Sequence, residues 1–306
     1  MVILHHYPQS PVSEKVRVVL GLKGLDWRSV EIPRLPPKPD LMPLTGGYRL
    51  TPVMQVGADI YCDSQCIIRE LERRFPEPTL FPEGTSGMAW GLSRWTDGPL
   101  FRTAVALVFG AGAADLPPEF AADRGRLYFG TGFDLAALTE ALPGTLAQLR
   151  AQLGWLEDCF TDSREFLAGS RPGLADALGY YLVWFIRGRY AKGPEFLEPF
   201  ERLCTWESRV KDVGHGNMSA MDAGEALDAA RDAQPESAEK VDTNDPQNLK
   251  PGDEVAVVPD GVDCAPPVFG CIHALTPQEI VIRRTDGRVG DVAVHFPRVG
   301  YRIYQV

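Results

Sequence analysis

The stretch VILHHYPQSPVSEKVRVVL, residues 2–20, places a strand signal and a helix signal on the two sides of a Ser-Pro pair. Val2 to Tyr7 is rich in residues that favour strands. Apolar residues then recur on one helical face, at Val12, Val16, Val19 and Leu20. Ser10 and Pro11 stand where such a helix begins, because Ser is a favoured N-cap and Pro is favoured in the first turn. The stretch therefore predicts a strand that leads directly into a helix.

Residues 27–82 continue this alternation of strands and helices. Strand-forming residues recur in three segments, Trp27 to Ile32, Val53 to Val56 and Ile60 to Cys62. Gly57-Ala58-Asp59 separates the last two segments, which is typical of a tight hairpin. Apolar residues then return to helical spacing, at Ile67, Ile68, Leu71 and Phe75, before Pro76 ends the element. Residues 1–82 are therefore predicted to form an α/β domain.

Residues 86–235 carry helical periodicity in place of strand signals, which predicts a separate all-helical domain. Leu178 to Ile186 is apolar or aromatic on every side, so we expect this helix at the centre of a bundle. Gly173 is its expected N-cap, with Asp176 reaching back from the third helical position. A further short helix is predicted to start at Ser219, because Ser219-Ala220-Met221-Asp222 has the form of a capping box.

The end of the chain returns to strands after a polar stretch. Residues 236–248 are acidic and contain Ser and Asp, so they are predicted to form a linker. Five short strand signals follow, at Glu254 to Val258, Val268 to Ala274, Glu279 to Arg284, Asp291 to Phe296 and Tyr301 to Val306. With turns such as Pro-Gly-Asp between them, residues 249–306 are predicted to form a small all-β domain, an SH3-like barrel.

Charge and composition exclude several classes of function. The formal net charge is -10, so a nucleic-acid backbone is an unfavourable partner. Neither a membrane-spanning apolar run nor a signal peptide is recognisable, which predicts a cytoplasmic protein without a membrane partner. The six cysteines include no CxxC pair, so we expect free thiols and no metal. A disulfide between Cys264 and Cys271 is disfavoured in a reducing compartment.

Ser10 is the first candidate for chemistry. Its hydroxyl and the neighbouring N–H groups face the positive end of a helix dipole, which stabilises an anion. A bound thiol at this place would have a lowered pKa and a larger thiolate fraction, with the hydroxyl as the hydrogen-bond donor. The alternative is that Ser10 only caps the helix, and the residues by themselves leave both interpretations open.

The order and spacing of several short motifs resemble the glutathione transferase superfamily. The motifs are Tyr7 to Arg17, Leu50-Thr51-Pro52-Val53-Met54, Asp63-Ser64 with Ile67 and Ile68, and Gly173-Leu174-Ala175-Asp176. The resemblance covers the N-terminal domain closely and the helical domain loosely. It implies a thioredoxin-like domain followed by an all-helical domain, in agreement with the pattern of strands and helices. The predicted C-terminal barrel has no counterpart in ordinary two-domain members.

The resemblance also implies a glutathione site. Pro52 would be a cis proline that exposes backbone groups of Thr51, next to Leu50, to the cysteinyl part of glutathione. Asp63 and Ser64 would hold the γ-glutamyl end, with Ser64 and the helix N-terminus on its carboxylate. Arg49 would reach the glycyl carboxylate or a neighbouring acid.

Ser10 would activate the thiol, and Tyr7 is the alternative hydroxyl. Because family members that exchange disulfides carry Cys at the activating position, Ser10 favours a transferase or isomerase over a reductase. Gly173 departs from the usual Ser or Thr and should cap less well. Trp90, Trp95, Phe101 and Phe109 could line a pocket for the second substrate, although such an aromatic stripe is more often core.

The function implied is that of a glutathione transferase that conjugates or isomerises small electrophiles, as in detoxification, with glutathione as co-substrate and no metal. Members of the family are usually homodimers, so we expect a homodimer here. The alternative is a non-catalytic binding or scaffold protein with the same fold, in which the C-terminal barrel recruits a partner.

Overall fold

Strands and helices fall into two compact units in the computed structural model, which describes residues 1–162, 164–236, 238–262 and 265–306. The first unit comprises Met1–Ser13, Asp26–Arg74 and Asn217–Val306, and the second comprises Glu14–Leu25 and Phe75–Gly216. Cys264 lies outside the described residues, so the structure gives no information on its pairing with Cys271.

The first unit begins with the predicted strand, β1 (Val2–His6), all of whose residues are buried. It pairs in parallel with β2 (Asp26–Glu31) and antiparallel with β3 (Val53–Val56). β3 forms a hairpin with β4 (Asp59–Cys62), and α3 (Ser64–Arg74) follows. α1 (Pro11–Leu22) begins directly after Ser10, and its residues from Glu14 onward belong to the second unit. A short helix that was not predicted, α2 (Met42–Thr45), lies between β2 and β3. The strand order is that of a thioredoxin-like domain.

β5 (Asn217–Ala220) pairs in parallel with β2 and extends this sheet at its edge. The prediction of a helix from Ser219 was therefore wrong by one turn. Asp222 is the N-cap of α12 (Ala223–Arg231), because its carboxylate accepts from the N–H of Gly224 at 2.7 Å and Glu225 accepts from the N–H of Asp222 at 3.0 Å. Ser219 instead accepts a hydrogen bond from Arg28 on the neighbouring strand at 3.0 Å.

The five strands predicted at the C-terminus are confirmed. They are β7 (Glu254–Pro259), β8 (Val268–Leu275), β9 (Glu279–Asp286), β10 (Gly290–Pro297) and β11 (Tyr301–Gln305). Neighbours pair antiparallel in the order β11-β7-β8-β9-β10. Within the stretch predicted as a linker, β6 (Lys240–Val241) pairs with β8.

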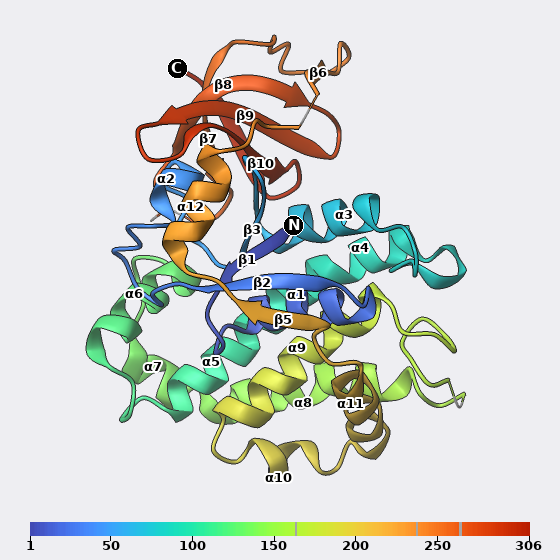
Figure 1. Ribbon diagram of the computed structural model, residues 1–306. Helices are drawn as coiled ribbons and strands as arrows, with labels where there is room; N and C mark the ends of the chain where they lie inside the picture. The colour runs from blue at the N-terminus through green and yellow to red at the C-terminus, as the bar shows by residue number, and fades with distance from the viewer. Residues whose placement is uncertain (163, 237, 263–264) are drawn as a thin grey trace. The chain divides into compact units, whose positions relative to one another are not determined.

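The C-terminal strands continue the sheet of the thioredoxin-like domain. β10, which Figure 1 labels, pairs in parallel with β4. Ala293 lies opposite Asp59, and His295 lies opposite Tyr61. One hydrophobic core contains Ile3 and Ile60 from the N-terminal strands together with Val294 and Ile303 from the C-terminal strands. The sequence did not predict this junction, because a parallel pair between distant segments leaves no local signal.

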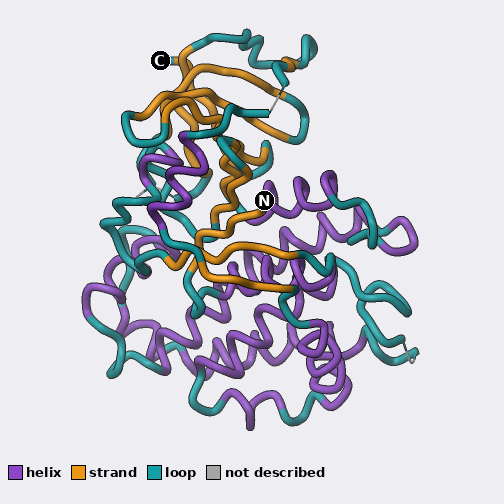
Figure 2. The backbone as a smooth tube through the Cα atoms, viewed as in Figure 1, coloured by secondary structure: helices purple, strands orange, loops and turns teal. Residues whose placement is uncertain are grey.

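The second unit is helical (Figure 2). A short 3₁₀ turn (Pro82–Gly84) precedes α4 (Ser86–Trp95), and a π-helical turn (Thr96–Leu100) connects α4 to α5 (Phe101–Ala111). The other helices are α6 (Pro118–Phe129), α7 (Leu135–Glu140), α8 (Leu142–Asp158), α9 (Leu174–Arg189), α10 (Gly193–Leu197) and α11 (Glu201–Val213). In the part of the chain that is described, no helix is both long and apolar enough to span a membrane.

α9 is the central helix of this unit, as predicted, and its residues from Leu174 to Val183 are buried. Asp176 is fully buried and accepts from the N–H groups of Gly173 at 2.9 Å and Leu167 at 2.8 Å, and from Trp206 Nε1 at 2.7 Å. The predicted helix start is therefore confirmed. The predicted fold class is confirmed as well: a thioredoxin-like region, a helical region and a C-terminal sheet of several strands.

Candidate functional site

The predicted site residues all lie in the first unit, and strand register brings three of their positions to one end of the sheet. His5, near the end of β1, is opposite Val53, the first residue of β3. Val53 is in turn opposite Cys62, the last residue of β4. Pro52 directly precedes β3 and Asp63 directly follows β4, while Ser10 lies four residues beyond the end of β1. The three motifs therefore meet at the same end of these neighbouring strands, although more than fifty residues separate Ser10 from Asp63.

Ser10 caps α1 and is almost fully buried, with 2% of its surface exposed. Its N–H donates to the carbonyl of Tyr7 at 3.1 Å, and its Oγ accepts from the N–H of Ser13 at 3.2 Å. A hydroxyl that accepts through its oxygen keeps its proton available for donation. The capping role and a donor role toward a bound anion are therefore compatible at this residue.

Tyr7, the alternative hydroxyl, lies between β1 and Ser10. It is buried, and the guanidinium of Arg34 lies 5.9 Å from the centre of its ring. This contact fixes the ring through a cation–π interaction.

The peptide bond between Thr51 and Pro52 is cis, as the resemblance implied. Lys38 holds the preceding loop: its ammonium group donates to the carbonyl of Arg49 at 2.8 Å and to Thr51 Oγ1 at 2.9 Å. Only 2% of Lys38 is exposed. Lys38 was not among the predicted site residues, because a lysine between prolines carries no periodicity that marks it as buried.

Asp63 and Ser64 form the start of α3. Asp63 has a positive φ of 76°, and its carboxylate accepts from the N–H of Gln65 at 2.8 Å. Its carbonyl accepts from the N–H of Ile67 at 3.0 Å, so Asp63 is the N-cap. Ser64 is the first helical residue and is buried. The N–H groups of this first turn form a place that favours an anionic group.

Cys62 and Cys66 flank this turn but are not activated thiols. Both are buried, and burial, together with the charge of Asp63, raises the pKa of each thiol well above its ordinary value. A thiol with a raised pKa stays protonated and is a poor nucleophile. Among the described residues, no group of His, Cys, Asp and Glu side chains has a geometry that could hold a metal ion.

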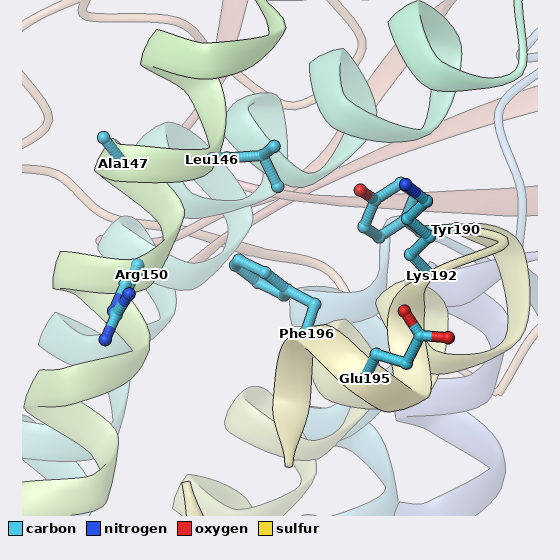
Figure 3. Close-up of a pocket in the computed structure, with 7 residues that line it drawn as sticks. All are labelled: Leu146, Ala147, Arg150, Tyr190, Lys192, Glu195 and Phe196. Atoms are coloured by element: carbon cyan, nitrogen blue, oxygen red, sulfur yellow. The ribbon is translucent and has the colours of Figure 1, made fainter. Parts of the chain in front are cut away.

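The aromatic residues suggested for a second-substrate pocket lie in the helical unit. Phe101 and Phe109 are buried and contact Tyr128 and Phe120, respectively, so they belong to the core. Trp90 and Trp95 are half-buried. None of the four lines the cavity of about 460 Å³ that lies between α8 and the junction of α9 with α10 (Figure 3). The residues around that cavity are Leu146, Ala147, Arg150, Tyr190, Lys192, Glu195 and Phe196.

Comparison with known proteins identifies relatives with the same fold. Residues 4–79 match the family model described as glutathione S-transferase, N-terminal domain. The crystal structure of a GST-like protein from Pseudomonas syringae is similar over 100% of both chains, with 36% identity and a TM-score of 0.78.

Two curated proteins are more distant. A probable glutathione S-transferase, GSTU6, from Oryza sativa subsp. japonica is 27% identical over 76% of this chain and 87% of its own length. A maleylpyruvate isomerase from Ralstonia sp is 28% identical over 28% of this chain and 41% of its own length.

Proposed function

Because this chain belongs to the glutathione S-transferase superfamily, we propose that it binds glutathione where β1 and β4 end and β3 begins, and that it activates the thiol for conjugation or isomerisation of a small electrophile. The observation that carries the proposal is that Ser10, cis-Pro52 and the start of α3 lie at the same end of the neighbouring strands β1, β3 and β4. Each of these positions offers a group that suits a different part of the tripeptide.

Ser10 supplies the chemistry. The Oγ that caps α1 retains a proton to donate to sulfur, and the first N–H groups of the helix add a positive potential. Both effects stabilise thiolate over thiol, so the bound thiol ionises at a lower pH than free thiol. Tyr7 is the alternative donor.

The remaining residues position the peptide. The backbone of Leu50 and Thr51 before Pro52 pairs with the cysteinyl residue, and Arg49 neutralises the glycyl carboxylate. Ser64 and the first turn of α3 receive the carboxylate of the γ-glutamyl residue, and the carboxylate of Asp63 binds its ammonium group. Lys38 supports this arrangement through the loop that carries Arg49 and Thr51.

The experiment measures glutathione binding by calorimetry, and turnover of an activated aromatic halide and of a cis-trans isomerisable diacid. The second substrate is included because a maleylpyruvate isomerase is among the relatives. We expect Ser10→Ala to lower kcat/KM by about 10²-fold, as for other lost donors to a developing anion. Loss of the cap should also lower the free energy of unfolding by about 1 kcal/mol.

Ser10→Thr is the matched control, because threonine keeps both the hydroxyl and the cap. Tyr7→Phe tests the alternative donor. Full activity in Ser10→Ala together with loss of activity in Tyr7→Phe would transfer the role to Tyr7. Absence of glutathione binding at millimolar concentration would refute the proposed function.

The family also suggests the setting in which the enzyme works. We propose a cytoplasmic homodimer with a role in detoxification, to be tested by fractionation and by light scattering of the purified protein.

A scaffold role is the second candidate, and one observation favours it. Phe269 on β8 and Tyr304 on β11 are 55% and 47% exposed, and both lie directly opposite Ala256 on β7. Residues opposite each other in antiparallel strands project to the same face, so the two rings form one exposed aromatic surface. Retention of glutathione without turnover, together with a partner lost in Phe269→Ser, would support this candidate.

A further inference from the structure

Two buried tyrosines connect the C-terminal sheet to the start of α3. Tyr301, the first residue of β11, places its hydroxyl oxygen 3.2 Å from Asp63 Oδ2 and 3.1 Å from the hydroxyl oxygen of Tyr48. Tyr301 is 8% exposed and Tyr48 is 4% exposed. Phe296 packs against both rings, with centroids 5.5 Å and 5.9 Å away. The two hydroxyls are therefore held in fixed positions.

The direction of these hydrogen bonds follows from proton count. A phenol has one proton, and an ionised carboxylate only accepts. Tyr301 therefore donates to Asp63, and Tyr48 donates to Tyr301. Burial, together with the nearby charge of Asp63, raises the pKa of both tyrosines well above the ordinary value, so both stay protonated donors.

The Asp63 carboxylate is consequently held from two sides. Oδ1 accepts from the N–H of Gln65, which fixes it to α3, and Oδ2 accepts from Tyr301. The residue also has a left-handed backbone conformation, which non-glycine residues seldom adopt. The conformation of this carboxylate thus depends on a strand more than 200 residues away in the sequence.

We propose that Tyr301 is a positioning residue of the tripeptide site, which orients the Asp63 carboxylate toward the γ-glutamyl ammonium group. This inference rests on the proposed function, since it specifies how one end of glutathione is recognised. It also gives the C-terminal sheet a role in ligand binding.

The test compares Tyr301→Phe with wild type for two ligands. One is glutathione, and the other is glutaryl-cysteinylglycine, which has the same skeleton without the α-amino group. We expect Tyr301→Phe to raise the Kd of glutathione about three- to tenfold, the range for the loss of one hydrogen bond of ordinary net strength. The Kd of the deaminated peptide should stay unchanged.

Tyr304→Phe is the matched control, because it removes a hydroxyl from an exposed residue of the same strand. Asp63→Asn provides a second line of evidence. If Tyr301 acts through Asp63, the double variant Asp63→Asn with Tyr301→Phe should bind glutathione no more weakly than Asp63→Asn does.

The outcomes separate this inference from the function on which it rests. If wild type does not bind glutathione, the proposed function fails first. If wild type binds and Tyr301→Phe binds equally well or more tightly, the inference is overturned. Equal weakening for both ligands also overturns it, because that result indicates a general structural effect rather than recognition of the ammonium group.

Discussion

The histidine at the junction of β10 with β4 provides a sharp prediction about stability. His295 is 3% exposed, and each of its ring nitrogens lies 2.8 Å from a carboxylate oxygen, Nε2 from Asp59 and Nδ1 from Glu279. Carboxylates only accept, so both nitrogens must carry protons and the ring must be an imidazolium. The ring also stacks on Tyr61, with centroids 4.2 Å apart.

Replacing His295 with Phe keeps a ring against Tyr61 but removes both donors. Asp59 is fully buried and keeps a hydrogen bond from the N–H of Glu236 at 2.6 Å, but it loses its charged partner. Removing one partner of a buried ion pair typically costs about 3–5 kcal/mol. At about 2–4 °C per kcal/mol, we expect the Tm of the variant to fall by about 6–20 °C.

The effect should depend on pH in a defined direction. Burial lowers the pKa of His295, but the hydrogen bonds and charges of Asp59 and Glu279 outweigh burial and raise it above the ordinary value of 6.5. A raised pKa means that the folded protein binds the proton more tightly than the unfolded chain. The stabilisation is therefore complete below pH 6.5 and is lost as the pH rises through the folded pKa.

The assay is calorimetric unfolding of both proteins across the neutral and alkaline range. The difference in Tm between wild type and His295→Phe should be largest at mildly acidic pH and should shrink toward high pH. His273→Phe is the control, since it replaces another histidine of the C-terminal sheet, one whose Nε2 lies 3.4 Å from a nitrogen of Arg283. A difference in Tm that stays constant with pH would show that His295 is not the charged partner inferred from its geometry.

Three further substitutions test the helical unit, each by chemical denaturation. Gly173→Ser should lower the free energy of unfolding by about 1–3 kcal/mol although serine is a better cap, because its Cβ would lie 2.8 Å from the carbonyl oxygen of Leu80. A higher free energy of unfolding in the variant would contradict this prediction. Gly21→Ala should destabilise more, since its Cβ would lie 2.1 Å from the carbonyl oxygen of Gly214, and near-wild-type stability would be unexpected. Asp176→Asn should cost about 2–4 kcal/mol and alter the fluorescence of Trp206, because the amide replaces an acceptor with a donor.

Local signals predicted most of the fold, and non-local pairing escaped prediction. Each C-terminal strand is a short run of strand-forming residues with turn residues between it and the next, so the bounds agree with the predicted ones within about two residues. The β5 strand was missed because all its residues are exposed and only its edge pairing with β2 defines it. For the same reason the helix was predicted to start at Ser219, whereas its N-cap is Asp222. Both residues can cap a helix, but the backbone of Ser219 already belongs to β5, which pairs with β2.

The candidate site divides in the same way. Ser10 was a candidate from its place at a helix start, and the resemblance to the glutathione transferase superfamily added Pro52 and Asp63 through short motifs next to strand ends. Tyr301 and Lys38 could not be found, because each acts on a motif from a segment without a motif of its own. The sequence indicated a weak N-cap at Gly173 but not why glycine occupies that position. The reason is visible only in the fold, where a Cβ at residue 173 would lie 2.8 Å from the carbonyl oxygen of Leu80.

The C-terminal strands are therefore better regarded as part of the thioredoxin-like sheet than as an appended module. β10 pairs with β4, and His295 on β10 contacts the carboxylate of Asp59 on β4. Tyr301 contacts Asp63 at the start of α3. Removing residues 249–306 would expose the edge of β4 and the shared core, so loss of activity in such a truncation would say nothing about partner recruitment. A scaffold role has to be tested by surface substitutions such as Phe269→Ser, which leave the buried face of β8 intact.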